Sequence, residues 1–200
     1  MMPYVLTLFA YLLGSISTAI VTCKLMNLPD PRTTGSNNPG ATNVLRVGGK
    51  KAAAITLCGD LLKGLVPVLL AKYWGLDLQW QFIVGFAAFL GHLYPLYYGF
   101  KGGKGVATAI GVYLGLNLWA ALAIIVTWLL IAKILKFSSL AALVATLLAP
   151  LFFYLFTQHV HLSIGLSGMT LLIYWRHRSN IRNLLTGKEG RIQPSDSRQN

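Results

Sequence analysis

The sequence predicts an all-α integral membrane protein with seven transmembrane helices, and three observations support that fold class. Hydrophobic residues make up 55% of the 200 residues and charged residues only 11%, whereas about a quarter of a typical soluble domain is charged. The apolar residues form runs of about 20, the length of a helix that crosses a bilayer. Most Lys and Arg residues stand at the ends of these runs, as is typical of cytoplasmic loops. We expect one membrane domain over residues 1–192 and a polar, flexible end at 193–200.

The net charge of +12 raises the question of nucleic-acid binding, because 17 Lys and Arg residues accompany only five acidic ones. The basic residues form no continuous stripe, so we attribute them to membrane topology and expect no nucleic-acid partner. Cys23 and Cys58 lie within apolar runs, without the spacing of a disulfide framework or a metal site, and we interpret both as small buried residues.

Residues 4–23 form the first apolar run, followed by Lys24 and preceded by no cation. This order is the reverse of a cleaved signal peptide, so we expect a retained span with its N-terminus outside. Gly14, Ser15 and Ser17 lie within it, and such small residues allow another helix to approach closely.

A polar stretch then interrupts the apolar pattern at residues 35–46. Its first half is rich in turn-forming residues, and its second half ends in the cation Arg46. Neutral hydrogen-bonding side chains beside a planar, permanently charged guanidinium suit an anionic, oxygen-rich ligand. An ordinary connecting loop is the alternative. The residues of interest are Ser36, Asn37, Asn38, Gly40, Thr42, Asn43 and Arg46.

The second span, residues 52–73, contains Asp60 and Lys63. The spacing of three residues puts both side chains on roughly one face of a helix. Charged groups at such depth are costly and usually pair or line a polar cavity. We favour a structural ion pair and keep direct ligand contact as the alternative.

The third span, residues 80–98, contains His92 and leads into a second polar stretch, residues 101–108. A lone histidine near the end of a span is more often a hydrogen-bonded structural residue than a catalyst. Gly102, Gly103 and Gly105 permit close backbone approach, and the next helix directs its N-terminal amides toward Lys104. These features predict a phosphate cradle, although such glycine-rich turns are also common connections. It is no Walker loop, because Gly105 replaces Ser or Thr after the lysine.

The placement of charge decides how the remaining apolar residues divide. Helices at about 104–117 and 118–135, followed by spans at 138–157 and 161–175, give seven crossings. This division puts nearly all basic residues on one side and leaves chiefly Lys72 opposite. The C-terminus is then cytoplasmic, as are both polar stretches.

The tail carries His177 and Asn180, three residues apart and so on one helical face. Ile181, Leu184 and Leu185 form an apolar edge that we expect to lie along the cytoplasmic surface. The Arg-His-Arg triplet at 176–178 satisfies the positive-inside rule by itself. Its position beside both polar stretches makes hydrogen bonding or proton transfer an equal interpretation.

Together the three polar segments predict a site for two phosphate groups, with Arg46 and Lys104 as its main cations. A lipid chain would lie between the spans. The sequence has neither a Ser-His-Asp order nor a cluster with metal-ligand spacing, so we expect no metal and no cofactor. A transporter of phosphorylated anions is the competing class, against which stand the lack of an inverted repeat and the one-sided polar segments.

The ordered combination of motifs resembles the bacterial acyl-phosphate:glycerol-3-phosphate acyltransferase family, PlsY. Each motif alone is unspecific, but the resemblance extends over residues from about 1 to 192. The motifs are Gly35–Arg46, Gly59–Gly64, Gly91-His92, Lys101–Thr108 and Trp175–Arg182.

This resemblance implies an enzyme of the bacterial inner membrane whose active site faces the cytoplasm. It would transfer a fatty acyl group from acyl phosphate to the 1-hydroxyl of glycerol 3-phosphate, giving lysophosphatidic acid and phosphate in the first step of phospholipid biosynthesis. The partners implied are the two substrates, membrane lipids and the soluble enzyme that makes acyl phosphate, and we expect a monomer. Matching motif positions imply catalytic roles for Ser36, Arg46, Lys104, His177 and Asn180.

Two routes remain for the proton of the attacking hydroxyl. His177 is a candidate base, but the adjacent Arg176 and Arg178 are expected to lower its pKa. The phosphate of the substrate is the other acceptor. We favour this substrate-assisted route, with His177 as a hydrogen-bonding support.

Overall fold

A computed structural model describes residues 1–192, and over this range the chain is helical and contains no β-strand. Residues 193–200, for which we expect a flexible end, lie outside the described part. The elements are α1 Met2–Gly14, α2 Thr18–Leu25, α3 Ala41–Tyr73, α4 Leu78–Leu93, the 3₁₀ helix η1 Leu96–Tyr98, α5 Val106–Leu116, α6 Leu118–Leu135, α7 Ser138–Thr157, α8 Val160–Arg176 and α9 Arg178–Leu185.

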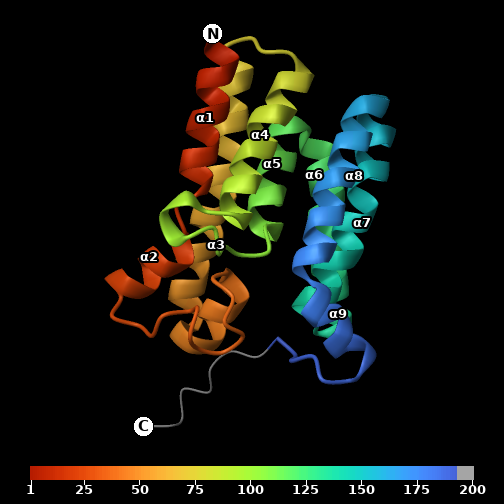
Figure 1. Ribbon diagram of the computed structural model, residues 1–200. Coiled ribbons are helices and arrows are strands. Elements are labelled where there is room, and N and C mark those ends of the chain that lie inside the picture. Colours follow the sequence, from red (N-terminus) through yellow and green to blue (C-terminus); the bar gives the residue numbers. More distant parts are fainter. Residues whose placement is uncertain (193–200) are drawn as a thin grey trace.

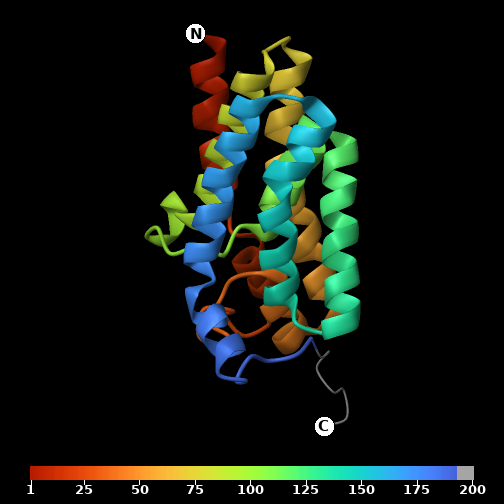
Figure 2. The same cartoon turned by 90° about the vertical axis from the view of Figure 1, so that its right-hand side faces the viewer.

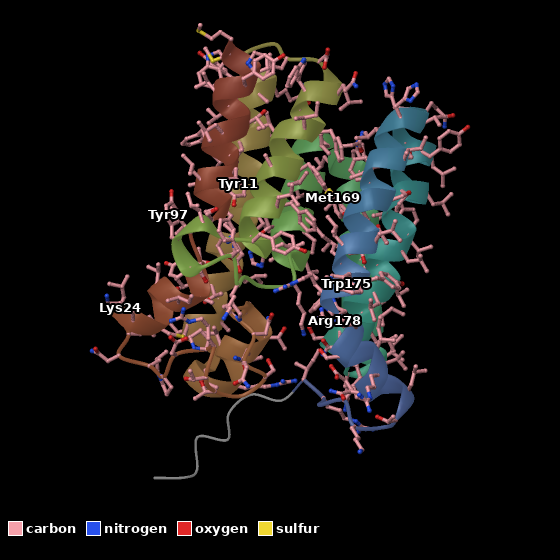
Figure 3. The ribbon with its side chains drawn as sticks, in the orientation of Figure 1. Tyr11, Lys24, Tyr97, Met169, Trp175 and Arg178 are labelled. Atoms are coloured by element: carbon pink, nitrogen blue, oxygen red, sulfur yellow. The ribbon has the colours of Figure 1, made fainter. Side chains whose placement is uncertain are left out.

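The helices α1 and α3 to α8 run alternately up and down and form one bundle (Figures 1 and 2). In the bundle α1 packs against α4, α3 against α5, and α7 against both α6 and α8. The short helices α2 and α9 lie toward the end of the bundle opposite the N-terminus (Figure 1). The basic side chains of Lys24 and Arg178 lie on this half of the molecule (Figure 3).

The bundle has an apolar outer surface as well as an apolar core. Within residues 1–192, three helices, α3, α6 and α7, are long and apolar enough to cross a bilayer, and the bent pair of α1 and α2 makes a fourth if it counts as one span. Large apolar side chains such as Leu69, Leu129 and Leu151 are exposed, and many exposed apolar side chains on helices of this length are stable against lipid rather than water. Inside, Phe89 and Tyr113 pack in one core with residues of α7 and α8.

The first span is broken where the sequence predicts one continuous helix. The chain bends by 44° between α1 and α2. The break frees the carbonyl of Ile16, and the Lys63 Nζ of α3 donates a hydrogen bond to it at 2.8 Å. The close helix approach predicted for Gly14 is confirmed, because a Cβ there would lie 2.1 Å from the Ala88 carbonyl oxygen of α4.

Other boundaries also differ from expectation. The α4 helix ends at Leu93, well before residue 98, because Pro95 cannot continue the helical hydrogen bonding. The predicted division after α5 is confirmed, since Asn117 ends that helix and its side chain caps α6 by accepting a hydrogen bond from the Ala120 amide. Cys23 is buried as expected, but Cys58 is exposed on the outer face of α3.

The long helix α3 starts earlier than residue 52. Its helical hydrogen bonding begins at Ala41, and Gly49, with φ +75°, separates a short first segment from the long second one. The second half of the first polar stretch is therefore helical. This places Thr42 and Arg46 on a helix instead of a loop.

Candidate active site

A cavity of about 320 Å³ lies among α3, α5, α6, α7 and the segment that follows α8. One part of its wall is polar and the other is apolar. The polar residues include Ser36, Asn38, Thr42, Asn43, Arg46, Asp60, His92, Lys104, Ser138, Ser139, His177, Asn180 and Glu189. The apolar ones include Leu57, Leu61, Val106, Ile110, Ile125, Trp128 and Leu129.

The structure thus brings together all three polar segments of the sequence. All five residues predicted as catalytic line the cavity, as do Gly40 and Gly105. Four other candidates do not: Asn37, Lys63, Gly102 and Gly103. Asn37 is an exposed turn residue with φ +56°, which explains its preference for this position without a ligand.

Asn43 shapes the first polar stretch from within. Its Nδ2 donates to the carbonyl oxygens of Pro31 at 2.8 Å and Thr34 at 3.0 Å, and its Oδ1 accepts from the Ser36 amide at 2.8 Å. A Cβ on Gly35 would lie 2.2 Å from the same Oδ1. The buried Asn43 side chain therefore holds Ser36 at the cavity wall and has little capacity left for a ligand.

The second polar stretch is built differently from the expected phosphate cradle. The amides of Gly102 and Gly103 donate at 3.2 Å to Leu93 and His92, the last carbonyls of α4, which have no partner within the helix. Their own carbonyl oxygens accept from the guanidinium of Arg176. These two glycines hold the loop against α4, and the residues of this region that line the cavity are Lys104, Gly105 and the first residues of α5, Val106 and Ala107.

Two cations lie at the polar part of the cavity. Lys104 Nζ donates to Asn180 Oδ1 at 2.5 Å, and an Arg46 nitrogen donates to the Gly190 carbonyl oxygen at 3.3 Å. Burial lowers the pKa of the Lys104 ammonium to about 8, because removing the charge from water penalises the protonated form. The Glu189 carboxylate opposes this shift in pKa, while Arg46 and Arg176 add to it.

His177 lies between α8 and α9 and is buried. Its Nδ1 is 2.8 Å from the carbonyl oxygen of Ile173, which can only accept, so the proton sits on Nδ1 and Nε2 carries the lone pair. Burial lowers the pKa of His177 to about 4, and the charge of Lys104 is the next cause. The predicted lowering of the His177 pKa is confirmed. Burial is its largest cause, Arg176 contributes less, and Arg178 is not among the causes.

A second cluster of charges lies deeper, where α3, α4 and α5 meet α2. The Asp60 carboxylate is 2.9 Å from Lys63 Nζ and 3.5 Å from His92 Nδ1, and it accepts a hydrogen bond from Thr18. His92 is also 3.1 Å from the Thr108 hydroxyl. The predicted ion pair is confirmed, and Asp60 and His92 form the part of the cluster that reaches the cavity.

Several lining residues were not predicted from the sequence. Ser138 bonds Thr42 at 3.0 Å, and Ser139 donates to Glu189 at 2.6 Å. Glu189 is the only glutamate of the sequence, a signal that points to it in hindsight. Arg176, which does not line the cavity, was expected to serve topology and to lower the pKa of His177, and it also anchors the second polar stretch.

Comparison with known proteins identifies the family. Residues 4–187 match the model of the glycerol-3-phosphate acyltransferases. The chain belongs to the glycerol-3-phosphate acyltransferase family. The glycerol-3-phosphate acyltransferase of Thioalkalivibrio sulfidiphilus (strain HL-EbGR7) is 59% identical over 94% of this chain and 92% of its own. That of Ruthia magnifica subsp. Calyptogena magnifica is 54% identical over 94% of this chain and 95% of its own.

Solved structures agree with this glycerol-3-phosphate acyltransferase assignment. The integral membrane glycerol 3-phosphate acyltransferase PlsY (YgiH), in its glycerol 3-phosphate form, superposes with a TM-score of 0.91 at 43% identity and covers 96% of both chains. Its lysophosphatidic acid form has a TM-score of 0.88 at 42% identity, with 96% of this chain and 95% of that chain covered. The predicted membrane acyltransferase is confirmed, and the transporter alternative is set aside.

Proposed function

We propose that this acyltransferase uses acyl phosphate as its donor and releases lysophosphatidic acid and inorganic phosphate. The observation that carries the proposal is the two-part cavity wall, in which Arg46 and Lys104 stand at the polar part and Leu57, Ile125 and Trp128 at the apolar part. Two phosphate groups and one acyl chain need this combination of cations and apolar surface.

The reaction needs little covalent chemistry from the protein. Acyl phosphate is a mixed anhydride with a good leaving group, so binding the hydroxyl next to the carbonyl supplies much of the rate enhancement. We assign charge neutralisation to Arg46 and Lys104, aided by the positive end of α5. Ser36 and Asn180 orient the glycerol and acyl oxygens. In the transfer step the hydroxyl oxygen bonds to the carbonyl carbon, and the bond from that carbon to the phosphate oxygen breaks.

We assign the proton of the hydroxyl to the departing phosphate. A pKa of about 4 makes His177 a weak base at neutral pH. The departing phosphate can accept the proton of the hydroxyl without help from His177. The Nε2 lone pair of His177 then accepts a hydrogen bond from the substrate and orients it.

The same proposal includes a topology. Seven crossings, with the N-terminus outside, place the ends of α6 and α8 and the start of α3 in the cytoplasm, together with the cavity. Lys133, Lys136 and the basic tail then lie on the cytoplasmic side, in accordance with the positive-inside rule. In this arrangement the monomer sits in the bacterial inner membrane and receives acyl phosphate from the soluble enzyme that makes it.

Purified protein in detergent tests the donor directly. Labelled glycerol 3-phosphate is supplied with acyl phosphate, with acyl-CoA or with acyl carrier protein thioester, and lysophosphatidic acid is measured. We expect product with acyl phosphate alone. Product from acyl-CoA at an equal rate, or none from acyl phosphate, would contradict the proposed donor.

A further inference from the structure

The segment after α9, residues 187–192, crosses back over the polar part of the cavity and is here called the strap. Ile192 donates its amide to the Lys136 carbonyl oxygen at 2.8 Å, and the Arg191 guanidinium lies 5.8 Å from the centre of the Phe137 ring. Gly190 accepts from Arg46. The strap is therefore held by the turn between α6 and α7 and by the start of α3, and Glu189 comes immediately before these anchors.

Glu189 contacts two lining residues through the same oxygen. Its Oε1 accepts from Ser139 Oγ at 2.6 Å and from Asn180 Nδ2 at 2.8 Å. The Oδ1 of the same Asn180 amide accepts a hydrogen bond from Lys104 Nζ. A continuous chain of hydrogen bonds thus runs from the strap to the cation of the second polar stretch.

The donor and acceptor properties of the three groups fix the direction of this chain. A carboxylate only accepts and must face the NH₂ of the Asn180 amide, whereas an ammonium only donates and must face its oxygen. With Glu189 in place, the Asn180 amide has one favourable orientation. Without that charge, Lys104 still favours this orientation of the amide, but no anion holds its NH₂ group any longer.

The charges around Lys104 show a second effect of Glu189. Arg46 and Arg176, from α3 and α8, and the ring of His177 face Lys104 from the elements packed around it. All of the charged neighbours except Glu189 favour loss of the Lys104 proton, as does burial. Within residues 1–192, Glu189 is therefore the carboxylate that opposes deprotonation at this position.

We propose that Glu189 is a positioning residue for acyl transfer, which orients Asn180 toward Lys104 and keeps the Lys104 ammonium protonated for the substrate phosphate. This inference rests on the proposed function, because it takes Lys104 and Asn180 as parts of the site. A residue that merely ties the strap to α7 would affect stability but leave the protonation of Lys104 unchanged. The two roles therefore differ in the pH dependence of the reaction.

The test measures kcat/KM for glycerol 3-phosphate between pH 6.5 and 9.5, a range above the phosphate ionisation near pH 6. In the wild-type enzyme we expect the rate to fall as Lys104 loses its proton. In Glu189→Gln, which keeps an acceptor oxygen but removes the charge, we expect this alkaline limb to move down by about one pH unit. At pH 6.5, where Lys104 is protonated in both proteins, the loss of activity that remains in Glu189→Gln measures the orientation of Asn180 alone. Glu189→Asp should keep the limb at its wild-type position.

Asp77→Asn is the matched control. It removes one carboxylate charge at the other end of the bundle, where the side chain caps α4 by accepting from Trp80, and an asparagine can retain that cap. Its alkaline limb should coincide with that of wild type. A limb that is unchanged in Glu189→Gln, or that moves equally in Asp77→Asn, would overturn the assignment.

Two further outcomes are decisive. If Glu189→Gln, Glu189→Ser and Glu189→Ala all fail to give a folded, monodisperse protein, Glu189 holds the fold and the positioning role is wrong. If wild-type protein makes no lysophosphatidic acid from acyl phosphate, the proposed donor is wrong. If wild type is active but the alkaline limb of Glu189→Gln does not move, the donor stands and the positioning role of Glu189 is wrong.

Discussion

Two groups of charged side chains meet the same cavity, and they differ in how their charges are compensated. In the deep group, Asp60 is paired with Lys63 and bonded to Thr18, and the ammonium also binds the Ile16 carbonyl. At the polar part of the cavity, Arg46 and Lys104 form no ion pair within residues 1–192 and bind only neutral oxygens. The deep charges therefore neutralise each other, whereas the outer cations need an anion from outside the protein.

The difference predicts that the two groups fail in different ways. Losing a deep charge leaves its partner buried without compensation and weakens the fold. Losing an outer cation removes repulsion within the site, so the fold should persist while substrate binding and catalysis are lost.

The largest effect is expected for Lys104→Ala and Arg46→Ala. Each removes a charge that is stabilising in a partly buried, low-dielectric site, and we expect kcat/KM to fall by about 10²–10⁴. Lys101→Ala is the matched control, because Lys101 is an exposed cation of the same loop and should stay near wild-type activity. Activity within a factor of three of wild type in both variants would remove these cations from the site.

The next effect is on stability. Asp60→Asn leaves the Lys63 side chain, of which only 4% is exposed, without its anion, and breaking a buried pair costs about 3–5 kcal/mol. The midpoint of unfolding in mixed micelles should fall, and the double variant Asp60→Asn/Lys63→Met should recover part of the loss. A double variant less stable than Asp60→Asn would contradict the paired role.

A smaller steric effect is expected for Gly103→Ala. The new Cβ would lie 2.2 Å from His92 Nε2 and 3.1 Å from the Pro39 carbonyl oxygen, so the second polar stretch must shift and move Lys104. We expect KM for glycerol 3-phosphate to rise by about tenfold, since a displacement near 1 Å is costly in a positioned site. Gly168→Ala is the control, because no atom lies within 4 Å of the new Cβ, and its KM should equal that of wild type. Gly99→Ala would be a poor control because Gly99 has a positive φ.

The smallest effect is expected for His177→Gln. Glutamine can still supply a polar group to the substrate, so activity should fall by about tenfold or less, with the same pH dependence between 6 and 8 as wild type. The low pKa of His177, about 4, means that wild-type histidine is already neutral over this range. A loss of several orders of magnitude would instead make His177 the base.

Most of the fold was predictable because the apolar runs determine where the helices lie and the basic residues at their ends indicate where each span stops. The positions of α6, α7 and α8, the break before α6 and the Asp60–Lys63 pair follow from local sequence. The bend between α1 and α2 did not, because Gly14 and Ser15 suit both a packed continuous helix and a broken one. The group that stabilises the freed Ile16 carbonyl is Lys63 of α3, which is distant in sequence, so local sequence could not indicate the bend.

The site was predictable in its members but not in its hydrogen bonding. Lys104, His177 and Asn180 were expected from one-sided topology, and they line one cavity. The amides of Gly102 and Gly103 were assigned to phosphate because a glycine-rich loop permits it, but the unpaired carbonyls at the end of α4 take them. Glu189 was missed because a polar tail has no periodicity that would show its return to the cavity.

The most direct measurement is equilibrium binding of glycerol 3-phosphate to purified wild type, Arg46→Ala, Lys104→Ala and Lys101→Ala, with the unfolding midpoint of each measured alongside. If the outer cations serve an external anion, at least one of the two site variants should lose about 30-fold in affinity, in line with a charged hydrogen bond worth about 2 kcal/mol. The midpoints should remain at or above that of wild type, and Lys101→Ala should bind normally. Unchanged affinity in both site variants, or a loss of affinity that only follows a loss of fold, would contradict the division between the two groups of charges.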